Sequence, residues 1–189
     1  MKVVIDPGHG GIDPGAVGRD TKLREADVNL AVAKLLAGRL AERGHEAVLT
    51  RTADAQLVPG DRNRDLAARP EVANRLHADC FLSIHCNAAV SREARGFEVF
   101  TTRGRDHSDS LAAHILEAWR TLLPDIRLRG AKEADFAVLR RAACPAALVE
   151  LAFISHPEEE RFLSGRANQE RMAEALDFGL CVWARSAGI

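Results

Sequence analysis

Short apolar segments alternate with amphipathic helical segments along this chain of 189 residues, and this alternation limits the folds that it can adopt. Segments with the length and composition of strands lie at 2–5, 47–50, 80–84, 97–101, 136–139 and 146–149. Nearly continuous apolar strands separated by helices are typical of a mostly parallel sheet that is covered on both faces. We therefore expect an α/β domain of three layers, with a mostly parallel central sheet of about six strands flanked by helices.

The helical pattern is clearest at about 26–43, where apolar residues recur on one face and Gly44 provides a left-handed stop. A second helix is expected to begin near Pro70, because proline is favoured in a first helical turn, and others at about 109–122 and 168–183. The sequence contains no repeat, low-complexity tract or linker. We therefore expect one catalytic domain over residues 1–189.

The charge balance of the chain indicates which partners it has. Lys and Arg number 26 against 27 Asp and Glu, and the aromatic residues are seven Phe, two Trp and no Tyr. A protein that neutralises phosphates and stacks bases needs more of both kinds, so we expect no nucleic-acid partner. Apolar runs are too short for a signal-peptide core or a membrane span, so we expect no membrane insertion and no export signal in this sequence. A removed leader, or a fragment of a longer protein, would leave the same pattern.

Polar residues of catalytic type directly follow three of the expected strands. His9 comes after the first, His85 after the third and Glu150 after the last. Ligands of open α/β sheets bind at the carboxyl ends of the strands, so parallel strands would bring these three residues to one edge. Glu25 is a fourth candidate, because the loop that leaves the first strand can fold back over that edge.

Two imidazoles and one carboxylate with an open fourth position describe a catalytic zinc site. The remaining carboxylate can then act as the general base and later as the general acid. Taken singly, a histidine at a strand end is more often a hydrogen-bonded structural residue, and Glu25 could simply favour the positive end of a helix dipole. Glu150 is the stronger candidate, because it interrupts the apolar run 146–153 and a buried charge needs compensation. Spacing alone leaves open which carboxylate binds the metal.

A set of motifs occurs in a fixed order over nearly the whole chain. It comprises Val-Ile-Asp-Pro-Gly-His-Gly-Gly at 4–11, Asp-Pro-Gly-Ala at 13–16, Glu25, Thr-Arg at 50–51, Arg69, Ser-Ile-His-Cys-Asn-Ala at 83–88 and Leu-Val-Glu at 148–150. Together these motifs resemble those of the zinc-dependent N-acetylmuramoyl-L-alanine amidases of the amidase-3 type.

The resemblance implies that His9, Glu25 and His85 hold one Zn²⁺ and that Glu150 is the catalytic carboxylate. It implies that the substrate is peptidoglycan and that the bond cut joins the lactyl group of N-acetylmuramic acid to L-alanine. The chain would then act on the cell wall, in the periplasm or outside the cell. Cys86 departs from the small alanine that is usual in the family, which bears on the shape of the cleft.

Some relatives insert a helix that blocks the cleft until an activator removes it. The segments after Asn87 and after Thr101 are too short for such a helix, so we expect an open cleft and no activator protein. Arg129 lies in a basic segment and could bind the carboxylates of the stem peptide, although an ordinary solvated loop is an equal alternative. Asn87, which follows His85 closely, is a second candidate for substrate binding.

Two other functions fit the same residues. The chain could be another zinc amide hydrolase, such as a peptidase or a deacetylase of sugar N-acetyl groups. It could also be a wall-binding module that keeps zinc only for stability, although such a module would have no use for the carboxylate of Glu150.

Overall fold

A six-stranded sheet with the order β2-β1-β3-β6-β4-β5 forms the centre of the protein. The structure is a computed structural model that describes residues 1–104 and 106–189. In this described part the strands are β1 (Lys2–Pro7), β2 (Glu46–Leu49), β3 (Cys80–Asn87), β4 (Phe97–Thr101), β5 (Leu128–Glu133) and β6 (Ala146–Phe153).

Strands β1, β2, β3 and β6 run in the same direction, and they form the half of the sheet that carries the candidate residues. Strand β4 is antiparallel to β6, and β5 is parallel to β4. The prediction of a mostly parallel sheet of about six strands flanked by helices is therefore confirmed. Because β1, β3 and β6 are neighbours and parallel, their carboxyl ends meet at one edge.

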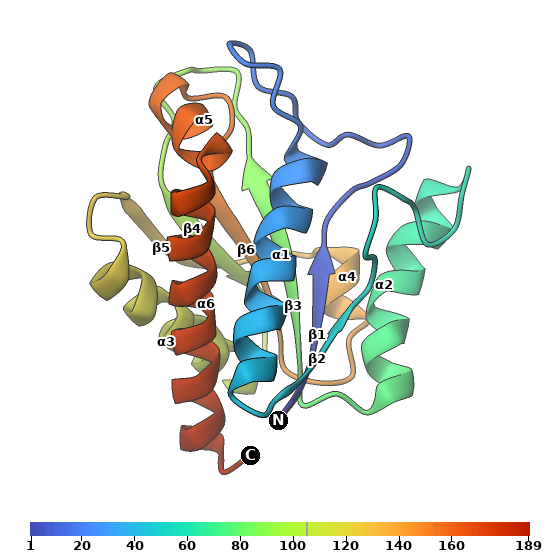
Figure 1. Cartoon of the computed structure of the whole chain (residues 1–189). Coiled ribbons are helices and arrows are strands. Elements are labelled where there is room, and N and C mark those ends of the chain that lie inside the picture. The colour runs from blue at the N-terminus through green and yellow to red at the C-terminus, as the bar shows by residue number, and fades with distance from the viewer. Residues whose placement is uncertain (105) are drawn as a thin grey trace.

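Helices cover both faces of the sheet (Figure 1). On one face lie α1 (Glu25–Glu42), α3 (Asp106–Leu122) and α6 (Arg166–Ala187), whose apolar residues join the larger core cluster. The opposite face carries α2 (Arg62–Leu76) and the single turn α4 (Ala137–Arg140), which form a smaller cluster. Helix α5 (Pro157–Ser164) follows β6 at the edge where the site lies.

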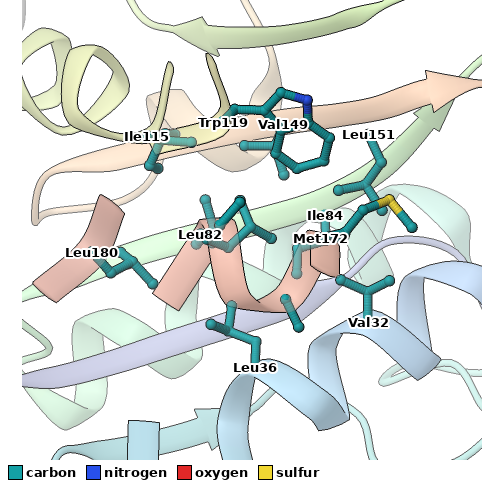
Figure 2. Close-up of a cluster of buried hydrophobic side chains, with 14 of the residues drawn as sticks. Val32, Leu36, Leu82, Ile84, Ile115, Trp119, Val149, Leu151, Met172 and Leu180 are labelled. Carbon is teal, nitrogen blue, oxygen red and sulfur yellow. The ribbon is translucent and has the colours of Figure 1, made fainter. Parts of the chain in front are cut away.

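The larger core forms because alternate strand residues point toward α1, α3 and α6. Figure 2 shows Leu82 and Ile84 of β3, Val149 and Leu151 of β6, and Leu36 of α1 as members of one cluster of buried side chains. Burial of each such side chain contributes about 1.5–3 kcal/mol to folding. The same alternation directs the intervening residues, which include His85 and Glu150, to the face that α2 and α4 only partly cover.

Helix α2 begins earlier than the sequence predicted. Its first residue is Arg62, and Pro70 lies inside the helix rather than in its first turn. The side chain of Asp61 caps the helix by accepting a hydrogen bond from the backbone N–H of Arg64 at 3.0 Å. Leu66 and Ala73, on either side of the proline, pack in the smaller core cluster, so the helix continues through Pro70 although one backbone hydrogen bond is lost there.

The expected strand at 136–139 is wrong, because these residues begin helix α4. An apolar run of four residues has no periodicity that separates a buried strand from a helical turn. The sixth strand is instead β5, whose sequence Leu-Arg-Gly-Ala-Lys-Glu was interpreted as a possible solvated loop. Charged residues are common on a strand at the edge of a sheet, where they hinder pairing with another chain. Helix α5 was also not predicted.

Within the described residues, no helix combines the length and the apolar character that crossing a bilayer would require.

Candidate active site

Three side chains that could hold a metal ion converge near the carboxyl ends of β1 and β3. The donor atoms of His9, Glu25 and His85 all lie within 4.8 Å of one another. Glu25 Oε1 is 3.1 Å from His9 Nε2 and 2.9 Å from His85 Nδ1. The two imidazole rings meet edge to face, with their centroids 5.0 Å apart. The side chains thus present two nitrogens and one carboxylate to a common point, which is the arrangement of a metal site.

His9 is held by the turn that follows β1. Its backbone has a φ of 62°, in the left-handed region, and the guanidinium of Arg69 donates a hydrogen bond to its carbonyl oxygen at 2.9 Å. The ring nitrogen Nδ1 lies 2.9 Å from the carboxylate of Asp13, so Nε2 faces Glu25. A carboxylate on the second nitrogen of a histidine fixes the orientation of the ring and makes the other nitrogen a stronger ligand.

A buried network of arginines fixes the backbone around this turn. Arg51 donates hydrogen bonds to the carbonyl oxygens of Pro7 and Gly8 at 2.9 Å, and Arg69 donates to that of Pro7 at 2.9 Å. Arg69 also forms an ion pair with the fully buried Asp6 at 2.9 Å. The sequence motifs that contain these residues therefore have a structural use, because they hold the segment that carries His9.

Glu25 opens helix α1 and reaches back over the edge of the sheet. The backbone N–H of Ala16 donates to Oε2 at 2.8 Å, and that of Cys86 donates to Oε1 at 3.1 Å. Burial alone would raise the pKa of Glu25, but the hydrogen bonds and charges of His85 and His9 lower it far below its usual range. The same contacts, together with Asp13, raise the pKa of His9 although its burial acts in the opposite direction. Glu25 is therefore an anion among groups that stabilise its charge.

Two glycines leave the space that these side chains occupy. A Cβ atom on Gly8 would lie 2.1 Å from Cε1 of His85. A Cβ atom on Gly15, which has a φ of +67°, would lie 2.6 Å from Oε2 of Glu25. Both positions therefore require glycine while His85 and Glu25 keep their observed places.

Glu150 lies beside the metal-binding residues but is not one of the three. It is opposite His85 in the parallel register of β3 and β6. Its Oε2 atom is buried and has no hydrogen-bond partner among the described residues. Burial, followed by the charges of Glu25 and Glu98, raises the pKa of Glu150 well above its usual range. A carboxyl group with these properties can exchange a proton, as general acid–base catalysis requires.

A cavity of about 240 Å³ opens onto the metal-binding histidines and Glu150 from the face of the sheet that carries α2 and α4. His9, His85 and Glu150 line it at the sheet, and Phe136, Ala137 and Val138 form an apolar wall from α4 and the residue before it. Its α2 side is polar and includes Gln56, Arg62, Asp65 and Arg69. Because α4 is only one turn long, this part of the sheet stays accessible to a ligand.

Asn87 and Arg129, the two residues predicted to bind substrate, converge on a carboxylate that the sequence reasoning missed. Asn87 Nδ2 donates to Glu98 Oε1 at 2.5 Å, and Arg129 Nε donates to Glu98 Oε2 at 2.7 Å. Arg129 lies on strand β5, so the alternative of a solvated loop is wrong for this residue. Glu98 interrupts the apolar strand 97–100, the same signal that had singled out Glu150.

Comparison with known proteins identifies the family. The sequence pattern described as N-acetylmuramoyl-L-alanine amidase (Amidase_3) matches residues 3–181. The chain belongs to the N-acetylmuramoyl-L-alanine amidase family. It is similar to AmiA of Salmonella typhimurium, an N-acetylmuramoyl-L-alanine amidase, with 33% identity over 94% of this chain and 74% of the relative. The family resemblance noted in the sequence is confirmed.

Solved structures of family members share the fold over nearly its whole length. The amidase AmiC2 of Nostoc punctiforme matches with a TM-score of 0.90 and 36% identity, covering 98% of this chain and 97% of that one. The CwlD amidase of Clostridioides difficile, solved in complex with the GerS lipoprotein, matches with a TM-score of 0.93 and 29% identity, covering 98% of each chain.

The alignment with AmiA is longer than this chain. It extends over 223 positions, more than the 189 residues of this chain, so AmiA carries inserted residues within the shared region. In the present structure, residues 88–96 and 102–104 contain no helix.

Proposed function

We propose that this amidase hydrolyses the amide bond between N-acetylmuramic acid and the L-alanine of the peptidoglycan stem peptide, with one Zn²⁺ held by His9, Glu25 and His85. The observation that carries the proposal is the convergence of the three donor atoms within 4.8 Å, next to the buried carboxyl group of Glu150. The family membership supports the reaction class, and the geometry supports the role of each residue.

The donor set fits zinc in both chemistry and spacing. Two imidazoles and a carboxylate are the ligands of many catalytic zinc sites. Ligand atoms at about 2.0–2.1 Å from a tetrahedral zinc lie roughly 3.3 Å from one another. The distances of 2.9 and 3.1 Å from Glu25 Oε1 to the two imidazoles differ from this value by a few tenths of an ångström. These two distances are close to those of a zinc site, and all three donor atoms lie within 4.8 Å of one another.

Zinc held by these residues would supply a Lewis acid that polarises a carbonyl oxygen and lowers the pKa of water to about 7. The protein then has to move one proton. Glu150 takes the proton of the attacking water and delivers it to the amide nitrogen as the C–N bond breaks. The products are a carboxylate on the lactyl group and a free amino group on L-alanine. The raised pKa of Glu150 suits the second half of this transfer, in which the carboxyl group carries the proton to the leaving nitrogen.

We also propose that Asn87 and Arg129 contact the substrate on the side of Glu150 that faces β4. Both side chains are partly accessible, and both are oriented by Glu98, which is only 3% exposed. Their substrate contacts would lie beyond the leaving nitrogen, where the stem peptide begins.

We propose further that the enzyme acts on the cell wall and needs no activator. The absence of a helix at 88–96 and 102–104 supports an open cleft. A rate of wall hydrolysis that stays the same when a candidate partner protein is added would support this proposal. A large rate increase would contradict it.

Product analysis tests the reaction. Purified peptidoglycan is incubated with the zinc-loaded protein, and the soluble products are analysed by mass spectrometry. We expect stem peptides with a new N-terminal alanine. Released acetate would indicate a deacetylase instead, and wall binding without any product would indicate a binding module.

A further inference from the structure

Glu98 lies in line with the catalytic residues across the sheet. It is opposite Glu150 in the antiparallel register of β4 and β6, and Glu150 is in turn opposite His85. These three side chains occupy one row on the open face of the sheet. The row therefore extends from the metal site toward β5. In the proposed reaction Glu150 meets the scissile amide, so Glu98 lies on the side of Glu150 that faces away from the metal.

Two cations converge on the single carboxylate of Glu98. Arg129 Nε and Lys132 Nζ both donate to its Oε2 atom, and their ion pairs shield a side chain that is 4% exposed. The guanidinium of Arg129 also lies over the ring of Phe153, 4.9 Å from its centroid, which fixes its plane. One carboxylate faces two positive charges, so the cluster as a whole carries an excess charge of about +1 at neutral pH.

Both cations are partly exposed. The side chain of Arg129 is 29% exposed and that of Lys132 is 39% exposed. Lys132 Nζ lies 5.8 Å from the ring of Phe100, and that ring contacts Phe136, which lines the cavity. Lys132 is thus connected to the wall of the cavity through Phe100 and Phe136. An anion arriving there would find preorganised donors of opposite charge.

We infer that Arg129 and Lys132, oriented by Glu98, form a subsite for a carboxylate of the stem peptide. The inference rests on the proposed function, because it takes the scissile amide to lie between the metal and Glu150. The ligand is the free α-carboxylate of the second stem residue, a γ-linked glutamate.

The dimensions of the sheet agree with this assignment. Neighbouring strands are about 4.8 Å apart, so β4 lies about 5 Å and β5 about 10 Å from β6. An extended peptide advances about 3.3–3.6 Å per residue, so a carboxylate two residues beyond the scissile nitrogen lies about 7 Å from it. Arg129 and Lys132 reach back from β5 toward Glu98 and therefore present their charges within this range.

The test compares two muramoyl peptides that differ only at this carboxylate. One carries a free α-carboxylate on the second stem residue, and the other carries the α-amide. A charge-assisted hydrogen bond contributes about 1.5–3 kcal/mol, so we expect the wild-type kcat/KM to favour the carboxylate about 10- to 100-fold. In Arg129→Gln and in Lys132→Gln this ratio should fall toward about 1. Each single variant leaves Glu98 one cation, which protects the fold, and circular dichroism checks it.

Two matched variants serve as controls for charge and direction. Arg127→Gln removes the same charge from an exposed residue of the same segment, and it should keep the wild-type ratio. Arg62→Gln removes it from the opposite end of the cavity and should also keep the ratio. Loss of the ratio in Arg62→Gln but not in Arg129→Gln or Lys132→Gln would overturn the inference, because the peptide would then run the other way.

A wild-type kcat/KM ratio near 1 between the two substrates would also overturn the inference. Failure of the proposed function would look different, since neither substrate would then yield a free N-terminal alanine. A readout that needs no turnover is binding of the product peptide to the protein by calorimetry. The affinity should fall about 10-fold or more when the peptide is amidated or when Lys132 is replaced by Gln. Equal affinities in all cases would again count against the subsite.

Discussion

His85 and Glu150 are direct neighbours across the parallel strands β3 and β6, so the sheet itself sets the separation between a metal ligand and the proposed proton carrier. Both residues lie in the C-terminal half of a strand whose other face is packed against the larger core. Rigid strands position catalytic groups more precisely than loops do. The pairing of β3 with β6 therefore places the proposed chemistry on rigid strands of the central sheet.

Replacement of Gly8 by Ala should expel His85 from the metal site. The new Cβ atom would lie 2.1 Å from the imidazole ring, and the β3 backbone holds the base of that side chain. We expect zinc affinity to fall by about 100-fold, at the upper end of the losses seen when the support of a metal ligand is removed. Competition with a chromophoric chelator measures the affinity.

The matched control is Gly38→Ala. Gly38 lies in the middle of α1, and a Cβ atom there would meet nothing within 4 Å. Alanine is the better helix former, so the free energy of unfolding should rise by about 0.5–1 kcal/mol while zinc affinity is retained. If Gly8→Ala binds zinc as tightly as Gly38→Ala does, the proposed geometry of His85 is wrong.

Replacement of Asp13 by Ala should weaken zinc binding without abolishing it. The carboxylate of Asp13 lies 2.9 Å from Nδ1 of His9 and orients the ring. Loss of such a partner typically lowers metal affinity 10- to 100-fold. Activity should then return when zinc is added in excess. An affinity identical to that of the wild type would show that the turn alone orients His9.

Zinc affinity should increase with pH. In the metal-free protein, burial acts to lower the pKa of His9, but Glu25 and Asp13 raise it above its usual value of about 6.5, so a proton competes with the metal. His9 therefore stabilises the metal-free fold fully below about pH 6.5, and this contribution is lost as the pH rises through the raised pKa. The metal-bound form needs neutral imidazole, so its affinity follows the opposite trend. Calorimetry in buffers of different ionisation enthalpy should detect proton release on binding, and the absence of proton release near pH 6 would contradict this assignment.

The edge of the sheet that carries the site could be predicted from the sequence. Strand composition is a local signal, and ligands of open α/β sheets generally bind at the carboxyl ends of the parallel strands. His9, His85 and Glu150 each follow an apolar run, and the structure brings all three to one cavity. The choice between Glu25 and Glu150 as the candidate metal ligand could not come from spacing. It depends on how the loop 8–24 folds back, which is set by contacts such as that between Glu25 and the backbone of Cys86.

Other features escaped prediction for identifiable reasons. Glu98 reaches the site only through the antiparallel pairing of β4 with β6, a long-range register that no local pattern encodes. The polar edge strand β5 resembles a loop because its side chains are charged, and the four apolar residues at 136–139 fit a strand as well as a helical turn. In each case tertiary contacts decided between alternatives that are nearly equal locally.

The central claim is that one carboxyl group carries the proton while three other side chains hold the metal. The most direct measurement determines zinc content and the release of peptides with an N-terminal alanine for the wild type, His85→Ala and Glu150→Ala. We expect Glu150→Ala to retain one zinc per chain and lose at least about 99% of the activity, since general acid–base catalysis typically contributes 10²- to 10⁴-fold. His85→Ala should lose both the zinc and the activity. Hydrolysis by Glu150→Ala at the wild-type rate would contradict the account.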